Sequence, residues 1–235
     1  MNLLILSLVL GSLNSGEAIL SKLRENQKYE SSKFTAEIEI RKGKRVLKKA
    51  FSGLSQGENF YIEFTNPEDR GVKYLKLKKD LYIYLPDIDD VVRISGDMLK
   101  QSFMGSDLSY EDIMEEDPLR YYKLKSERDT LIGSQNFKVL ELIDTAGTAP
   151  YYRVIMFVDT VKNIWIKEEL YAKSGRKIKE VEALEYRRVK GKYYPVSVIM
   201  RDLRLKDSYT KFILKEVDFD ITIPAHHFRI ENLKK

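Results

Sequence analysis

Short runs in which apolar and polar residues alternate recur along most of this chain, and they constrain its fold more than any other feature. In the first run, Phe34, Ala36, Ile38 and Ile40 alternate with polar side chains. This period of two places the apolar side chains on one face of a β-strand and leaves the other face to water. Further runs of this kind span residues 45–53, 59–65, 72–78, 81–85, 91–95, 121–128, 137–144, 152–159, 163–172, 177–188, 193–204 and 208–221.

The runs are separated by turn residues, among them Asn66-Pro67, Ser174-Gly175 and Lys190-Gly191-Lys192. About a dozen strands joined by such turns predict one antiparallel meander. A sheet of this size curls because strand twist accumulates. It either closes completely into a barrel, or stays partly open and presents a concave apolar face that needs a cover.

Two segments have the pattern of short helices that could supply this cover. Residues 17–29 carry apolar side chains near helical spacing, and Ser15 is a possible cap. Residues 96–116 form the second segment, in which Ser109 and Asp112 fit a capping box, with Asp112 in the place of the usual Glu.

The N-terminus begins with the apolar run MNLLILSLVLGSL. Because a bilayer span needs about 20 apolar residues, this run is too short to cross a membrane. It fits the apolar core of a secretory signal peptide, and Gly16 and Ala18 are suitably small for a cleavage site. We therefore predict a signal peptide over residues 1–18 and a single domain over 19–235. The alternative is that the run forms a buried first helix of the domain.

Composition argues against several classes of function. The 41 basic and 36 acidic residues alternate along the chain, so the net charge of +5 does not predict nucleic-acid binding. Cysteine is absent, and His226-His227 has no further ligand that would make a metal site. No nucleophile elbow, phosphate loop or dinucleotide fingerprint is present. We expect no enzymatic activity, no cofactor and no metal.

Four motifs resemble those of a known family. They are residues 66–71 (NPEDRG), 82–86 (YIYLP), Arg93-Ile94 and 103–112 (FMGSDLSYED). In order and spacing they are similar to outer-membrane lipoprotein-sorting proteins of the LolA-like group, and the resemblance extends from Phe34 to the C-terminus.

The resemblance implies a mainly β fold: a curved antiparallel sheet of about 11–12 strands forms an incompletely closed β-barrel, with short helices covering its concave apolar face. It also implies an exported, soluble, monomeric carrier in the periplasm. Such a carrier shields the acyl chains of lipoproteins or other lipids between inner-membrane export machinery and an outer-membrane acceptor. Relatives of this fold also include envelope sensors, so a sensor whose lipid site controls a signalling partner is the alternative.

A carrier of this type needs a dry groove and a removable cover. We expect the cover to be formed by Phe103, Met104, Leu108, Tyr110 and Met114. Tyr82 and Tyr84 are expected at the mouth of the groove, and Gly105, Ser106 and Asp107 are expected to shape a structural turn. The alternative is that the same segment permanently plugs one end of the barrel.

Overall fold

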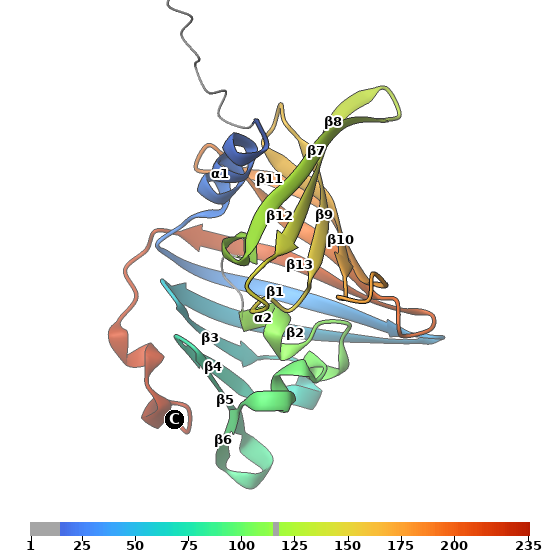
Figure 1. Ribbon diagram of the computed structural model, residues 1–235. Helices are drawn as coiled ribbons and strands as arrows, with labels where there is room; N and C mark the ends of the chain where they lie inside the picture. The colour runs from blue at the N-terminus through green and yellow to red at the C-terminus, as the bar shows by residue number, and fades with distance from the viewer. Residues whose placement is uncertain (1–14, 115–117) are drawn as a thin grey trace, which may run out of the picture.

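A computed structural model describes residues 15–114 and 118–235, and the described strands form one antiparallel sheet (Figure 1). Its order is β6-β5-β4-β3-β2-β1-β13-β12-β11-β10-β9-β8-β7. The strands are β1 (Ser31–Lys42), β2 (Arg45–Gln56), β3 (Asn59–Phe64), β4 (Lys73–Leu77), β5 (Asp80–Leu85), β6 (Asp90–Ile94), β7 (Tyr122–Ile132), β8 (Gln135–Asp144), β9 (Arg153–Asp159), β10 (Ile164–Tyr171), β11 (Lys177–Val189), β12 (Lys192–Asp202) and β13 (Ser208–Phe219).

The helices of the described residues are short. They are α1 (Ser15–Gln27), α2 (Tyr110–Met114) and the 3₁₀ turns η1 (Pro67–Asp69), η2 (Pro86–Ile88), η3 (Gly96–Lys100), η4 (Phe103–Gly105), η5 (Pro118–Tyr121), η6 (Ala225–Phe228) and η7 (Ile230–Asn232). None of these helices is long and apolar enough to span a membrane. The predicted signal peptide lies mostly outside the described residues, and its residues 15–18 form the first turn of α1.

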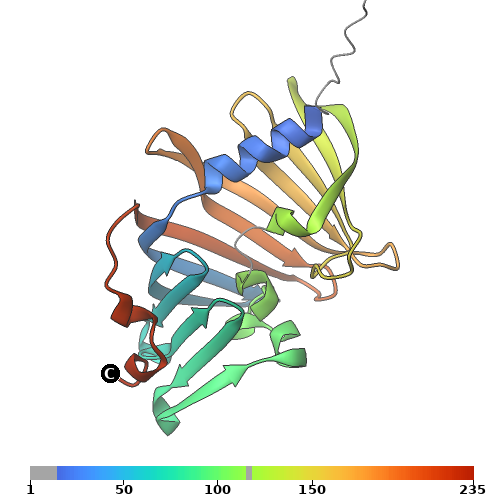
Figure 2. The same cartoon turned by 60° about the vertical axis from the view of Figure 1, so that its left-hand side comes forward.

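The predicted fold class is confirmed, with thirteen strands in the described chain instead of 11–12. Consecutive strands pair as hairpins, and the pairing of β1 with β13 joins two meanders into one sheet. The sheet stays open because its edge strands, β6 and β7, do not pair with each other. Register shifts in β1, β10 and β11 accompany its curvature, since a bulge bends a strand and increases its twist. Figure 2 shows the curved sheet with α1 lying across one half.

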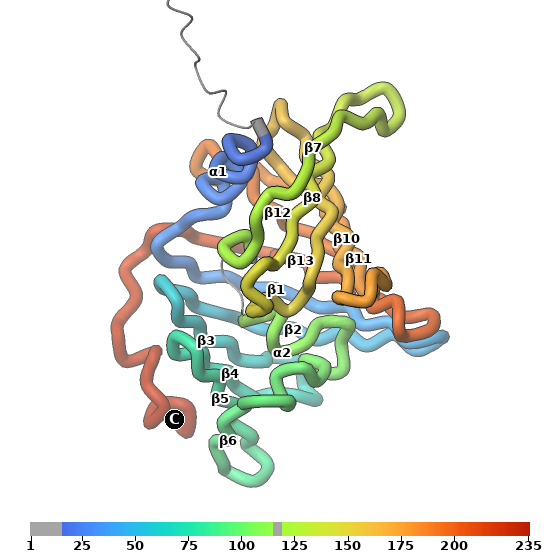
Figure 3. The backbone as a smooth tube through the Cα atoms, viewed as in Figure 1, coloured from blue at the N-terminus to red at the C-terminus, as the bar shows by residue number. Residues whose placement is uncertain are grey.

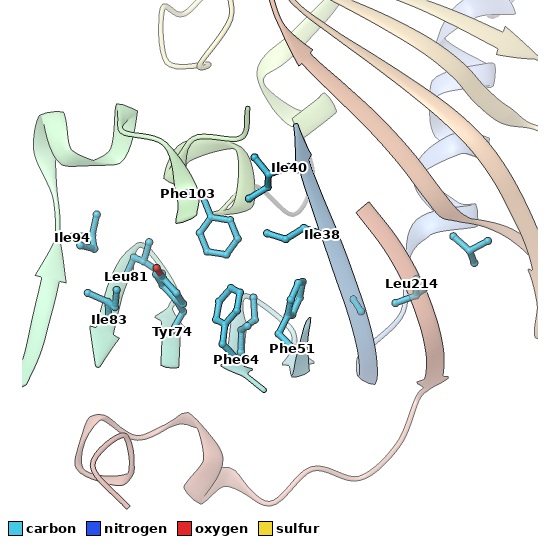
Figure 4. Close-up of a cluster of buried hydrophobic side chains, with 13 residues drawn as sticks. Ile38, Ile40, Phe51, Phe64, Tyr74, Leu81, Ile83, Ile94, Phe103 and Leu214 are labelled. Atoms are coloured by element: carbon cyan, nitrogen blue, oxygen red, sulfur yellow. The ribbon is translucent and has the colours of Figure 1, made fainter. Parts of the chain in front are cut away.

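The concave face carries two apolar clusters. The first cluster lies on β1–β6 and extends to β12 and β13 (Figure 4). Its buried members are Ala36, Ile38, Ile40, Phe51, Ile62, Phe64, Tyr74, Leu81, Ile83, Ile94, Phe103, Val196 and Leu214. The second cluster lies between α1 and β8–β11. Its buried members are Leu20, Leu23, Leu140, Leu142, Val154, Met156, Val158, Leu170 and Val181.

The C-terminal segment covers part of the opposite, convex face. Its Leu233 is buried, and the backbone oxygen of Leu233 accepts a hydrogen bond from Lys73 Nζ at 3.0 Å. Tyr84 pairs with Lys73 across β4 and β5, and Tyr82 pairs with Leu75. Directly paired residues share a face of a sheet. Tyr82 and Tyr84 therefore lie on the convex face, and the prediction that they lie at the mouth of the concave groove is wrong.

Candidate functional site

Residues 96–114, here called the cover segment, pack onto the first cluster. Phe103 is 2% exposed, and its ring lies 5.1 Å from that of Tyr74 and 6.0 Å from those of Phe64 and Tyr110. Edge-on and tilted ring pairs at these distances are favourable beyond the area that they bury. Phe103 therefore anchors the segment in the sheet (Figure 4).

The turn after Phe103 has an unusual backbone. Met104 has a φ of 51° and Gly105 a φ of 76°, both in the left-handed region. A glycine adopts this conformation without a steric penalty, whereas a methionine rarely does. The sulfur of Met104 accepts a hydrogen bond from the Tyr74 hydroxyl at 3.0 Å, and this contact helps to hold the strained residue. Burial raises the pKa of Tyr74, so the hydroxyl stays protonated as the donor.

Asp107 connects the next part of the cover segment to β12 and β13, in the middle of the sheet. The side chain is 2% exposed. Its Oδ2 accepts hydrogen bonds from the hydroxyls of Ser208 and Thr210, both at 2.9 Å, and its Oδ1 accepts one from the backbone N–H of Asp202 at 3.0 Å. Three bonds to β12 and β13 make Asp107 a long-range anchor, whereas the sequence predicted only a residue of a local turn. Ser106 does bond locally, since its hydroxyl accepts from Leu108 N–H at 3.1 Å.

Asp112 forms a second anchor. It completes the predicted capping box, because its Oδ2 accepts from the N–H of Ser109 at 2.7 Å and the hydroxyl of Ser109 accepts from its N–H at 3.2 Å. The same carboxylate pairs with Lys179 Nζ of β11 at 2.5 Å and accepts from the Tyr151 hydroxyl at 2.5 Å. The side chains of Lys179 and Asp112 are only 3% and 6% exposed. Burial and the nearby Asp112 raise the pKa of Tyr151.

Helix α1 covers the second cluster with weaker connections. Its Leu20 and Leu23 are buried there. The Asn26 amide donates to the backbone oxygen of Asn163 at 2.7 Å, and Lys192 Nζ donates to that of Glu25 at 2.8 Å. No buried ion pair joins α1 to the sheet in the described part of the chain. Of the two covers, α1 is therefore the one that a ligand could displace more easily, since its apolar contacts resemble those a ligand would make.

A cavity of about 240 Å³ lies on the concave face in the middle of the sheet. All of its lining residues come from strands or strand ends, so neither cover fills it. They are Ser32, Phe34, Ser55, Tyr194, Pro195, Val198, Phe212, Leu214 and Val217. Five of the apolar ones pack with the first cluster, and Val198 packs with the second. The cavity thus lies between the two clusters, and its walls are largely apolar.

Two details shape this cavity. The Phe34 ring lies directly over Gly53, where an added Cβ would be 2.3 Å from the ring. The hydroxyls of Ser32 and Ser55 bond to each other at 2.7 Å, which satisfies the polar groups of one wall. A larger cavity of about 630 Å³ lies beside the cover segment, but its walls include Lys76, Lys78 and other charged residues. Charged walls suit a polar ligand, so the central cavity is the better site for an apolar one.

One carboxylate lies on the apolar face without a compensating group. Glu168 of β10 pairs across the sheet with Met156 and Val181, both members of the second cluster. Within the described chain the Glu168 side chain makes no hydrogen bond or ion pair. Burial raises its pKa to about 7. Tyr186 lies near enough that burial and the charge of Glu168 both raise the tyrosine pKa.

The predicted cover residues come together. Phe103, Met104, Leu108, Tyr110 and Met114 all pack against the first cluster. Sequence reasoning missed Lys179, Thr210 and Glu168. Lys179 had a readable signal, because it falls in register with Val181 and Ala183 on the apolar face of its strand. Glu168 had a similar signal, because it is two residues from Leu170, a buried member of the second cluster.

Among the described residues, no group of three or more His, Cys, Asp or Glu side chains is arranged so that it could hold a metal ion. His226 and His227 lie in the 3₁₀ turn η6 and not on an extended segment. Their ring centroids are 4.3 Å apart.

Solved structures share this architecture over nearly the whole chain. A protein of the DUF1329 family from Desulfovibrio piger is 24% identical, with a TM-score of 0.83, and the match covers 93% of this chain and 98% of that one. An outer membrane lipoprotein-sorting protein domain from Vibrio parahaemolyticus is 20% identical over 94% and 100% of the two chains, with a TM-score of 0.80. A LolA superfamily protein from Nitrosomonas europaea is 22% identical over 92% and 98%, with a TM-score of 0.77.

These likenesses show that the fold is the LolA-like open β-barrel, as the resemblance in sequence predicted. No curated protein matches the sequence. A family model whose description is that of an uncharacterized protein matches residues 56–235. Because this span is more than half of the sequence, the chain belongs to that family, which has the LolA-like fold.

Proposed function

We propose that this protein is a non-enzymatic carrier that binds acyl chains of lipoproteins, or of a related lipid, on the concave face of its sheet. The observation that carries the proposal is the apolar cavity between the two clusters. Its largely apolar lining and its position between two covers are what a site for an aliphatic chain requires.

The cavity must expand to hold a whole acyl chain. Ligand pockets usually enclose about 300–1,000 Å³, which is more than the 240 Å³ found here. Lifting α1 would extend the cavity over the second cluster. Each buried methylene contributes about 0.8 kcal/mol, so a chain of some fifteen carbons yields on the order of 10 kcal/mol before ordering costs. Affinity is therefore ample, and a cover that exchanges with the ligand makes release possible.

The proposal extends to the setting in which the protein works. A signal peptide over residues 1–18 would bring a soluble domain of residues 19–235 to the periplasm. There it would receive cargo from inner-membrane export machinery and deliver it to an outer-membrane acceptor. Native mass spectrometry of the purified protein tests this role. One diacyl lipid bound to each protein molecule would support it.

Filling the cavity is expected to abolish ligand binding without loss of stability. In the Val198→Phe variant the new ring would occupy the space that an acyl chain needs, and cavity filling usually stabilises a fold. Titration with an apolar fluorophore should show at least about tenfold weaker binding, which corresponds to about 1.4 kcal/mol. Val161→Phe is the matched control, because Val161 is 89% exposed in the turn after β9. Equal binding by both variants would place the ligand elsewhere.

Hydrogen exchange is expected to identify α1 as the movable cover. Amides of α1 should exchange through local opening, whereas amides of the central strand β1 should exchange only on global unfolding. The cover segment, held by Asp107 and Asp112, should exchange nearly as slowly as β1. Fast exchange of the cover segment beside a protected α1 would instead make residues 96–114 the lid.

A further inference from the structure

Hairpins from distant parts of the sequence meet at one end of the sheet. They are the turns β1–β2, β12–β13 and β10–β11, which reach toward the same side of the molecule (Figure 3). Gly43 N–H donates to the backbone oxygen of Asp207 at 2.8 Å, and Leu203 N–H donates to that of Ile178 at 2.9 Å. These bonds join the turns into one surface. We call residues 41–48, 172–177 and 201–207 the hairpin end.

The hairpin end concentrates positive charge. Residues 41–49 read RKGKRVLKK, with six basic residues and no acidic one, so the expected alternation of basic with acidic residues does not hold in this hairpin. Of the nearby carboxylates, Asp202 is already paired with Arg204 at 2.6 Å, and Asp207 is exposed. Several exposed cations have no carboxylate within ion-pair distance among the described residues: Lys42, Lys44, Arg45, Lys173, Arg176 and Lys206.

Exposed aliphatic side chains stand among these cations. Val46 is 47% exposed, Leu47 37%, Leu203 41% and Leu205 44%. The turn of residues 203–206 reads LRLK, so that leucines and cations alternate in it. Large aliphatic side chains in water are unfavourable, and a cluster of them among cations marks an interaction site.

A groove of about 470 Å³ runs between the β1–β2 hairpin and the β12–β13 turn. Its walls carry the cations Arg41, Lys44 and Arg201, the side chains of Leu203 and Leu205, and two carboxylates, Asp202 and Asp207. Asp202 is paired with Arg204 and Arg201 with Glu182, so Arg41 and Lys44 are the wall cations that make no ion pair among the described residues. Guanidinium and ammonium groups bind phosphate oxygens through charge-assisted hydrogen bonds. The groove thus offers a phosphate partner beside apolar side chains.

We propose that the hairpin end docks on a bilayer surface that contains anionic phospholipids. The cations would bind headgroup phosphates while Leu203, Leu205, Val46 and Leu47 enter the interface. Aliphatic tips suit this occupant better than single-stranded nucleic acid, which binds to stacking aromatic rings. Docking does not depend on the ligand in the concave cavity, so this inference stands apart from the proposed function.

Vesicle flotation tests the proposal with the whole protein. It should bind vesicles of phosphatidylcholine and phosphatidylglycerol, fail to bind phosphatidylcholine alone, and detach as salt rises. The variant Lys42→Glu/Lys44→Glu/Arg45→Glu should bind at least about tenfold more weakly, since each cation near an anionic surface contributes to binding. The matched control is Lys33→Glu/Lys123→Glu/Arg128→Glu, which changes the net charge equally through exposed residues away from the hairpin end.

A second pair of variants tests the leucines. Leu203→Ser/Leu205→Ser should weaken vesicle binding severalfold, whereas Leu131→Ser/Ile132→Ser should not, although these two residues are 67% and 45% exposed on another hairpin. The proposal is overturned if the wild type ignores anionic vesicles, or if either control variant loses as much binding as its partner. Fluorophore binding by the same variants reports separately on the concave cavity.

Discussion

Replacing Asp112 with alanine is expected to destabilise the protein by about 3–5 kcal/mol, the range for breaking a buried ion pair. The change would leave Lys179, whose side chain is 3% exposed, as an unpaired buried charge. It would also remove the acceptor of the Tyr151 hydroxyl and of the Ser109 N–H. Urea unfolding followed by circular dichroism measures the loss.

Two further variants separate the buried charge from other effects of the change. Asp112→Asn/Lys179→Met removes both charges together and should recover much of the stability, because an apolar replacement of a whole buried pair is often nearly neutral. Asp97→Ala removes a carboxylate from the same segment whose side chain is 95% exposed, so unfolding should not change measurably. If Asp112→Ala unfolds like the wild type, Asp112 does not hold the cover segment.

The second expected result concerns pH. Burial raises the Glu168 pKa from 4.5 to about 7, so the folded state binds this proton more tightly than the unfolded chain does. The stabilising contribution of the protonated group is complete below pH 4.5 and is lost as pH rises through 7. A shift of this size corresponds to at most about 3 kcal/mol, because the half-buried Glu168 is partly screened by water.

Replacement of Glu168 tests this dependence directly. Glu168→Leu should abolish the decline between pH 4.5 and 7 and should be more stable than the wild type above pH 7, by up to about 3 kcal/mol. Glu185→Leu, an exposed change on the neighbouring β11, should retain the wild-type pH profile. The measurement is the midpoint of urea unfolding for each variant at several pH values between 4.5 and 7. A wild-type decline that persists in Glu168→Leu would assign the titration to another group.

Below pH 7 the protonated Glu168 leaves the face beneath α1 nearly apolar, whereas above it a charge lies among the residues of the second cluster. An apolar fluorophore should therefore bind more weakly above pH 7 in the wild type, and Glu168→Leu should remove this difference. Titration of Glu168 would thus report both on the stability of the fold and on fluorophore binding at the concave face.

The local patterns of the chain predicted the strands well. Alternation in residues such as Phe34, Ala36 and Ile38 specifies which face of a strand is buried, and this depends only on neighbours in sequence. The capping box of Ser109 and Asp112 was equally readable, because its partners are three residues apart. Alternation with Leu81 and Ile83 in fact puts Tyr82 and Tyr84 on the opposite face of β5, so the prediction that they lie at the mouth of a concave groove went against the local pattern.

By itself, therefore, the sequence determined the class of fold, the strands and the apolar segment that packs on the first cluster. Only the tertiary structure decided that Asp107 and Asp112 anchor this segment, that Glu168 lies unpaired beside the second cluster, and that cations from three hairpins share one surface. Their partners are far apart in the chain, as Asp107 and Thr210 are. Pairing of β1 with β13 brings such groups together, and no short-range pattern encodes that pairing.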